Sequence, residues 1–312
     1  MQRDLIKYTL LFFTPLIIGL IALELISRNL TNEFKVKQNS IALHQEDIET
    51  IVTGSSQMKR SINPEWIDSY TLNLSSSGQH HDTDFKLLKE LVPQFKNLKT
   101  VVLEVSYSHF ELPHNGYNFW KNPLYLYYYK ANLFDHTPYL KDRMLFLTSP
   151  PKFIINIKQN FYLKNPEFDV NEFGYLINGY AGMFKKLNYD ESKIKKVKEI
   201  DINHVSNDII FNKNTSYFYE MLDYLSERNL NIIVCNVPMY KTYLEIRNPV
   251  ILKRRDSILK VVSETYPSVH FLNKEEDSIT FEAEDFVNHS HLNPKGAKKF
   301  TEKLNKIIQQ LD

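Results

Sequence analysis

The sequence predicts an α/β protein: a three-layer, doubly wound and mostly parallel sheet with a large aromatic-rich insertion, preceded by one transmembrane helix. From residue 48 onwards, short apolar runs alternate with helix-like segments of more than ten residues, as parallel strands joined by crossover helices do. The alternation stops between about residues 108 and 212, and a long apolar run lies near the N-terminus. We therefore expect one α/β domain over residues 48–312 that is interrupted once and tethered to a membrane.

The N-terminal run has the length of a membrane span. Residues 8–26 read YTLLFFTPLIIGLIALELI and contain one charged residue, Glu24, and about 20 such residues cross the hydrocarbon layer. Arg3 and Lys7 precede the run, and basic residues on this flank favour a cytoplasmic N-terminus. A cleaved signal peptide is disfavoured because no small-residue cleavage pattern follows the run. We expect an uncleaved anchor over residues 1–28, with the globular domain outside the cytoplasm, in the periplasm or at the cell surface.

The rest of the chain divides by composition and periodicity. Residues 29–47 are polar without strong periodicity and are expected to form a stalk. Beyond it, β-prone runs end at glycine or serine clusters, and longer segments carry apolar residues at helical spacing. The expected strands are residues 48–53, 71–74, 100–107, 231–237 and 269–272. The expected helices are residues 83–95, 216–228 and 248–265, and a closing helix begins at Pro294.

The insertion, about residues 108–212, is rich in aromatic side chains. Nine aromatic residues lie between Tyr117 and Tyr139. Aromatic faces can stack on sugar rings, but they more often form the core of the subdomain that holds them. We therefore expect these aromatic residues to form the core of a subdomain. An apolar groove formed by residues 117–163 would instead favour an esterase that acts on lipid.

Charge and cysteine content exclude two classes of function. The chain has 38 basic and 37 acidic residues, a formal net charge of +1, whereas nucleic-acid binding calls for a clustered basic face. The single cysteine, Cys235, cannot form an intramolecular disulfide or a multi-cysteine metal site. Its apolar neighbours predict a buried strand position.

Two polar blocks at opposite ends of the domain carry the chemistry. Gly54, Ser55 and Ser56 follow the first expected strand, and residues 288–294 read NHSHLNP before the last helix. Loops at the carboxyl ends of parallel strands line one crevice, so a serine and a histidine from these blocks can meet there. Each block alone is typical of an ordinary turn or helix start. Together they offer a hydroxyl and a base, the pair that acyl transfer requires.

The two blocks resemble those of the SGNH or GDSL-like hydrolase superfamily. The likeness is to its membrane-anchored envelope branch, which includes the D-alanyl transfer protein of teichoic acid synthesis and alginate O-acetylation enzymes. In that branch the first strand ends in Gly-Ser-Ser or Gly-Asp-Ser, and Asp-x-x-His-Leu-Asn-x-x-Gly-Ala precedes the last helix. Here residues 288–297 read NHSHLNPKGA. The resemblance covers residues 48–107 and 213–312 and leaves the insertion out.

The resemblance implies a role for each matching residue. Ser56 would be the nucleophile, with Ser55 as the alternative, and His291 would be the general base. Gly78, in the block Asn73–Gly78, would donate a backbone N–H to the oxyanion together with Ser56. The implied chemistry needs neither a cofactor nor a metal.

One position departs from the family pattern. Asn288 stands where the family has an aspartate, and an amide does not stabilise an imidazolium as a carboxylate does. In the serine protease template this exchange costs about 10⁴ in kcat. Three hypotheses stay open: Asp285 orients His291, Asn288 is sufficient to orient it, or the site has lost its catalytic activity.

The predicted activity is hydrolysis or transfer of an O-acyl ester on a cell-envelope glycan, with acetyl as the expected acyl group. The resemblance adds a membrane acyltransferase as a candidate partner. The alternative, favoured by Asn288, is a catalytically inert component that binds glycan or acts as a scaffold in an envelope polysaccharide system.

Overall fold

The computed structural model describes residues 2–113, 119–163 and 170–311. The chain forms two compact units. We call residues 1–35 and 120–168 the anchor unit, and residues 36–119 and 169–312 the sheet unit. The expected insertion, about residues 108–212, is thus divided between the two units.

The sheet unit contains a five-stranded parallel sheet with the strand order β2-β1-β3-β4-β5. This confirms the predicted α/β class with a mostly parallel sheet. The strands are β1 (Thr50–Val52), β2 (Thr71–Asn73), β3 (Thr100–Glu104), β4 (Asn231–Asn236) and β5 (Val269–Asn273).

The strands form from continuous apolar runs because both faces of the sheet are covered. Ile51 of β1 pairs with Leu72 of β2 and with Val101 of β3, and all three side chains are buried. Cys235 is buried in β4, as its neighbours predicted. The carboxyl ends of β1 and β3 therefore lie side by side, and each is followed by polar residues.

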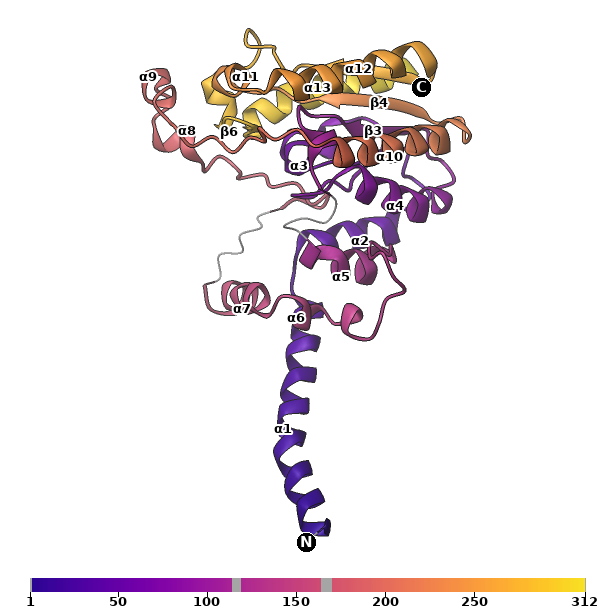
Figure 1. The fold of residues 1–312 in the computed structure, drawn as a ribbon, viewed down its shortest axis with the longest axis vertical. Helices are drawn as coiled ribbons and strands as arrows, with labels where there is room; N and C mark the ends of the chain where they lie inside the picture. Colours follow the sequence, from indigo (N-terminus) through magenta and orange to yellow (C-terminus); the bar gives the residue numbers. More distant parts are fainter. Residues whose placement is uncertain (1, 114–118, 164–169, 312) are drawn as a thin grey trace. The chain divides into compact units, whose positions relative to one another are not determined.

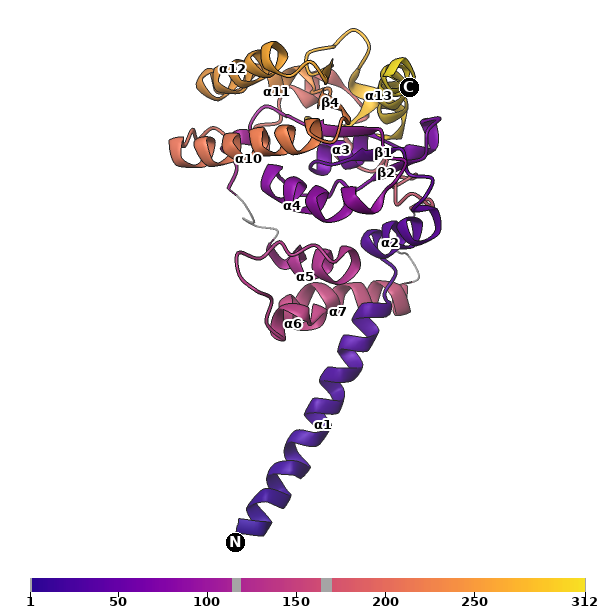
Figure 2. The same ribbon diagram turned by 90° about the vertical axis from the view of Figure 1, so that its right-hand side faces the viewer.

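Helices lie on both sides of this sheet (Figures 1 and 2). Right-handed crossovers place α4, α10 and α12 on one face and α3 and α13 on the other. Accordingly, Phe218 of α10 stacks on His81 of α4 with ring centroids 4.7 Å apart, and Thr301 of α13 donates to Ser61 O of α3 at 3.0 Å. These helices are α3 (Ser56–Ser61), α4 (His81–Leu91), α10 (Asp208–Ser226), α12 (Pro249–Thr265) and α13 (Pro294–Leu311).

Shorter elements complete the chain. A two-stranded antiparallel ribbon of β6 (Phe286–Asn288) and β7 (His291–Leu292) precedes α13 and was not predicted. The remaining short α-helices of the sheet unit are α8 (Met183–Lys186), α9 (Glu191–Ile194) and α11 (Lys241–Glu245). Its 3₁₀ turns are Pro64–Trp66, Val92–Gln94, His109–Glu111 and Ala283–Asp285.

Residues 29–47, expected to form a stalk, contain the helix α2 (Glu33–His44). Polar side chains in its second half find partners in the sheet unit: Lys37 Nζ donates to Ser75 O at 3.0 Å, and the hydroxyls of Ser40 and Tyr70 lie 3.0 Å apart. A helix buried through polar contacts carries no apolar stripe, which is why periodicity did not reveal it.

The anchor unit consists of α1 (Gln2–Asn29) and the aromatic-rich segment. Among the described residues, α1 is the helix long and apolar enough to cross a membrane, with a mean hydropathy of 2.3 over its most apolar 18 residues. The segment forms α5 (Asn122–Leu124), α6 (Leu145–Thr148), α7 (Pro150–Lys158), π-helical turns at Tyr125–Tyr129 and Gln159–Leu163, and a 3₁₀ turn at Lys141–Arg143. A further 3₁₀ turn, Phe119–Lys121, precedes α5.

Aromatic side chains form the core of this unit. Tyr125, Tyr128 and Tyr129 are buried around Phe34, whose ring meets that of Tyr125 edge to face with centroids 5.0 Å apart. These rings therefore pack as the core of the unit, which is the commoner role of aromatic clusters.

Candidate active site

A sharp turn at Gly54 carries the chain from β1 into α3. The φ angle of Gly54 is +138°, and a Cβ there would meet Glu104 Oε2 at 2.6 Å and Glu104 Cβ at 2.7 Å. Only glycine fits this conformation and this space. Ser55 caps α3 by accepting the Gln57 N–H, so Ser56 becomes the first residue of the helix.

Ser56 faces His291. The Oγ atom of Ser56 lies 2.8 Å from His291 Nε2, although the two residues are 235 positions apart in the chain. His291 is the first residue of β7, and β7 is held in place by its antiparallel pairing with β6. The distance and the atoms are those of a hydroxyl whose proton the imidazole can accept.

The other ring nitrogen of His291 is held from behind. Nδ1 lies 3.1 Å from Asn288 Oδ1 and 3.1 Å from Ser290 Oγ. The amide oxygen also accepts the Ser290 N–H at 3.0 Å, which fixes the orientation of the amide. An acceptor at Nδ1 favours the tautomer with its proton there and leaves Nε2 as the acceptor for Ser56.

Asp285, the other candidate for the orienting role, is engaged elsewhere. Its Oδ2 accepts from Lys299 Nζ at 2.7 Å and from the Glu282 N–H at 2.9 Å. These contacts secure the segment before α13 and direct the carboxylate away from His291. The orienting position behind His291 is held by Asn288 and Ser290.

The imidazole is a weak base in this setting. Burial, and to a lesser extent the positive charge of Arg60, lower the pKa of His291 to about 4, with Glu104 acting in the opposite direction. The ring is therefore neutral near pH 7 and can accept a proton, but the imidazolium that results is poorly stabilised. The amide of Asn288, which contacts Nδ1, carries no negative charge that would oppose this shift.

The backbone N–H groups of Ser56 and Gly78 are the candidate oxyanion donors. The Ser76 N–H donates to Gly54 O at 3.0 Å and holds the loop of Gly78 beside that of Ser56. Ser56 begins α3, where an N–H has no intrahelical acceptor; within the described residues neither its N–H nor that of Gly78 has a hydrogen-bond acceptor. Unpaired N–H groups beside a nucleophile are suited to hold an oxyanion.

Comparison with known proteins leaves the family of this chain open. No family model matches it. No curated protein matches it either. Two solved structures resemble it at 10% identity: a protein of Bacteroides fragilis provisionally described as an acylhydrolase, and a protein of Streptococcus pneumoniae provisionally described as a platelet activating factor. The first has a TM-score of 0.42 and an alignment covering 88% of this chain and 95% of the other; the second has 0.41, 92% and 98%. Likeness at this level carries no argument about activity.

Ser55, the alternative nucleophile, is bound to a carboxylate. Its Oγ donates to Glu104 Oε1 at 2.9 Å and its N–H to Glu104 Oε2 at 2.5 Å. Burial alone would raise the pKa of Glu104, but hydrogen bonds from His109 and Ser55 lower it, so the carboxylate is ionised. Glu104 thus fixes the loop that presents Ser56, and the Ser55 hydroxyl donates to this carboxylate and not to an imidazole.

Glu104 and Arg60 are site residues that the sequence reasoning missed. Glu104 is the one acidic residue of the apolar strand β3 and lies at its carboxyl end, and that placement was the available signal. Arg60 follows Ser56 by one turn of α3, so both lie on one face of the helix. Its guanidinium has no hydrogen bond or ion pair within the described residues, and burial lowers its pKa.

The other histidine of the last block has a structural role. His289 is buried, and its Nδ1 lies 2.6 Å from Thr242 Oγ1. Burial lowers its pKa, so the ring is neutral. The side chain packs edge to face on Phe184 with centroids 5.1 Å apart, which makes it part of the core behind the ribbon.

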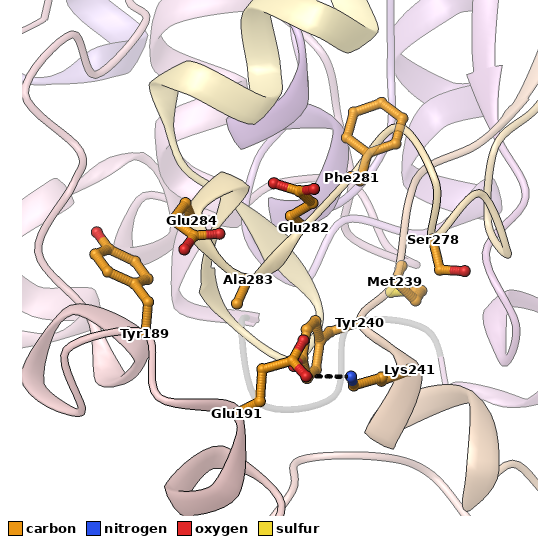
Figure 3. A pocket seen from close by; sticks show the side chains of 10 residues that line it. All are labelled: Tyr189, Glu191, Met239, Tyr240, Lys241, Ser278, Phe281, Glu282, Ala283 and Glu284. Carbon is orange, nitrogen blue, oxygen red and sulfur yellow. Dashed lines mark hydrogen bonds and ion pairs between the residues drawn. The ribbon is translucent and has the colours of Figure 1, made fainter.

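A separate cavity of about 490 Å³ opens elsewhere in the sheet unit (Figure 3). Three glutamates and one lysine are among the ten residues that line it, and the Lys241 ammonium is paired with Glu191 at 2.8 Å. Ser56, Asn288 and His291 do not line it. The cavity is therefore distinct from the candidate active site.

Proposed function

We propose that this chain is a serine-dependent O-acyl esterase or O-acyltransferase of the SGNH kind that acts on a cell-envelope glycan through an acyl-enzyme. The observation that carries the proposal is the 2.8 Å contact of Ser56 Oγ with His291 Nε2, backed by the 3.1 Å contact of Nδ1 with Asn288. Nucleophile, base and orienting acceptor stand in series, which is the arrangement that activates a hydroxyl.

The proposed reaction has two halves. Ser56 Oγ attacks the acyl carbon while its proton passes to His291 Nε2, and the Ser56 and Gly78 N–H groups hold the oxyanion. The intermediate collapses, the ester C–O bond breaks, and the leaving alcohol takes the proton from His291. Water or a sugar hydroxyl then gives a proton to the same nitrogen and attacks the acyl-enzyme. The bond between Ser56 Oγ and the acyl carbon breaks, and His291 returns the proton to Ser56 Oγ. Each step uses only side-chain and backbone groups of this chain and the two substrates.

The anchor gives the proposed site its setting. A membrane-spanning α1 would keep the chain where acyl donors and nascent polysaccharide are made, with the sheet unit on the extracytoplasmic side. In such a setting a membrane acyltransferase would be the partner that delivers the acyl group. Support for this part comes from the length and apolar composition of α1.

A second candidate function is an inert glycan-binding or scaffolding component. It is favoured by one observation, the pKa of His291 near 4 with an amide in place of the family carboxylate. A base that weak activates a serine poorly.

The test is turnover of p-nitrophenyl acetate by the full chain in detergent, with Ser56→Ala, His291→Ala and the exposed-serine control Ser216→Ala. We expect nitrophenol release by the wild type and the control and its loss in the two site variants. Labelling of Ser56 by an organophosphonate, read by peptide mass, is the independent check. Equal background rates in all four proteins, together with no labelling, would favour the inert component.

A further inference from the structure

We propose that the aromatic-rich segment of the anchor unit is a second membrane contact, and that its residues 139–161 lie in the interface between the lipid head groups and the hydrocarbon. The surface consists of six exposed apolar side chains: Tyr139, Leu140, Leu147, Ile154, Ile155 and Phe161. Each of them is 42–77% exposed. We call these six residues the interfacial patch.

Two residues of the patch, Ile154 and Ile155, lie on α7. In α7 the exposed positions Pro151, Ile154, Ile155 and Lys158 follow helical spacing, while Phe153 on the other face is buried. A helix that buries one side and exposes two isoleucines at the centre of the other is unusual in water. Its exposed face is apolar in the middle and basic at the end, which is the pattern of helices that lie in a bilayer surface.

A carboxylate fixes the level of this segment along α1. Glu24 accepts the Leu145 N–H at 3.0 Å and the Phe146 N–H at 2.9 Å, and Arg28 Nε donates to it at 2.7 Å. The side chain of Glu24 is buried by these contacts, whereas residues 8–22, 25 and 26 of the apolar run are exposed. The start of α6 is therefore attached to α1 at residue 24, and α7 follows α6 directly.

The position of Glu24 along α1 coincides with the expected edge of the hydrocarbon layer. At about 1.5 Å per residue, the 20 steps from Leu5 to Leu25 span about 30 Å, the thickness of the hydrocarbon core. Glu24 and Arg28 then lie where α1 leaves it. Figures 1 and 2 both show α7 running across the direction of α1 near the C-terminal end of that helix. A helix crossing a membrane span at this height lies along the bilayer surface.

The positive charge of residues 120–163 favours a lipid surface as the binding partner of the patch. Residues 120–163 hold six basic residues against two acidic ones, Asp135 and Asp142, a net charge of 6 − 2 = +4. Lys121 is buried, and the other five, which are at least partly exposed, are Lys130, Lys141, Arg143, Lys152 and Lys158. Basic side chains beside exposed apolar ones match anionic head groups above a hydrocarbon layer. Continuity with α1 makes this surface available without any further partner.

The experiment places an environment-sensitive fluorophore at single introduced cysteines in the full chain, reconstituted into vesicles of phosphatidylcholine and phosphatidylglycerol. The test sites are Ile154→Cys, Ile155→Cys and Phe161→Cys. Ile209→Cys and Ile279→Cys, at two exposed isoleucines of the sheet unit, are the matched controls, and Ile17→Cys marks the span. The native Cys235 is buried, and burial raises the pKa of its thiol, so it stays unlabelled.

We expect probes at the three test sites to shift to the blue and to lose most of their emission to nitroxides at head-group depth, more than to nitroxides at mid-bilayer. The Ile17 probe should show the opposite depth preference, and the two sheet-unit probes should respond to neither. Test probes as water-exposed as the controls would overturn the proposal and leave the face to a protein partner. A blue shift without quenching by lipid nitroxides would also overturn it, since the patch would then be covered by a second copy. An unquenched Ile17 probe would remove the anchor on which the proposal depends.

Discussion

Replacing Asn288 with aspartate would restore the carboxylate that the candidate site lacks. The new carboxylate would stand about where Asn288 Oδ1 is now, 3.1 Å from His291 Nδ1. An opposite charge at such a distance raises the pKa of an imidazole by roughly 1–3 units. The pKa of His291 would then rise from about 4 to between about 5 and 7, and the imidazolium formed during catalysis would be stabilised.

The expected gain follows from the reverse exchange. Aspartate to asparagine costs about 10⁴ in kcat in the serine protease template, so Asn288→Asp should raise kcat/KM by about 10-fold to 10⁴-fold, or about 1.4 to 5.5 kcal/mol of activation free energy. The assay is p-nitrophenyl acetate hydrolysis between pH 3.5 and 8, in which the half-point of the acid limb should move up with the pKa of His291. Asn203→Asp, which adds the same charge in a loop where the amide oxygen accepts the Val205 N–H, is the control.

Two results would refute the reasoning about Asn288. One is a variant whose acid limb does not move, because the introduced carboxylate would then not act on His291. The other is a variant with a shifted limb but an unchanged rate, because imidazolium stability would then not limit turnover. A wild type without measurable turnover beside an active Asn288→Asp would still support it, and would identify the native chain as the inert component.

Three further changes test neighbouring features. Arg60→Met removes the positive charge that helps to lower the pKa of His291, so the acid limb of the pH–rate profile should move to higher pH, and an unmoved limb would show that Arg60 is too well solvated to matter. Glu104→Gln removes the carboxylate that accepts both the N–H and the hydroxyl of Ser55, so we expect about 1–3 kcal/mol less stability in thermal unfolding and a lower kcat; an unchanged kcat would mean that the Ser56 loop holds its position alone. Burial raises the pKa of Asp84 from 3.8 to about 7, so its ionisation opposes folding increasingly from pH 4 to pH 7, and the stability of Asp84→Asn relative to wild type should increase by up to about 4 kcal/mol between pH 4 and pH 8. Parallel stability–pH curves for the two proteins would contradict that pKa.

The sheet could be predicted because its signal is local. Each strand is a buried apolar run closed by a polar cluster, and the start of α13 at Pro294 follows from the fixed φ of proline. The polar elements could not be predicted in the same way. The helix α2 buries Lys37 and Ser40 through hydrogen bonds to distant residues, and no pattern within residues 29–47 shows those partners.

In the candidate site too, some residues could be predicted from short motifs and others could not. Ser56 and His291 were singled out because the motifs around them are short and contiguous. The orienting residue could not be chosen from sequence, because Asp285 and Asn288 both precede His291 within a few residues, and only the path of the ribbon directs one toward the ring and the other toward Lys299. Glu104 and Arg60 act through contacts made across the fold or along one face of α3, so their residue types alone carry little information.

The contact of Glu24 with residues 145 and 146 limits how freely the anchor can be exchanged. A foreign helix of equal length and hydropathy in place of α1 would leave two N–H groups at the start of α6 without their acceptor. Those groups are 121 and 122 residues away in the chain. The Glu24 carboxylate therefore cannot form these two hydrogen bonds until the aromatic-rich segment has been synthesised. The helix α1 is thus a folded component of the anchor unit, and removal of residues 1–29 would take away part of that subdomain.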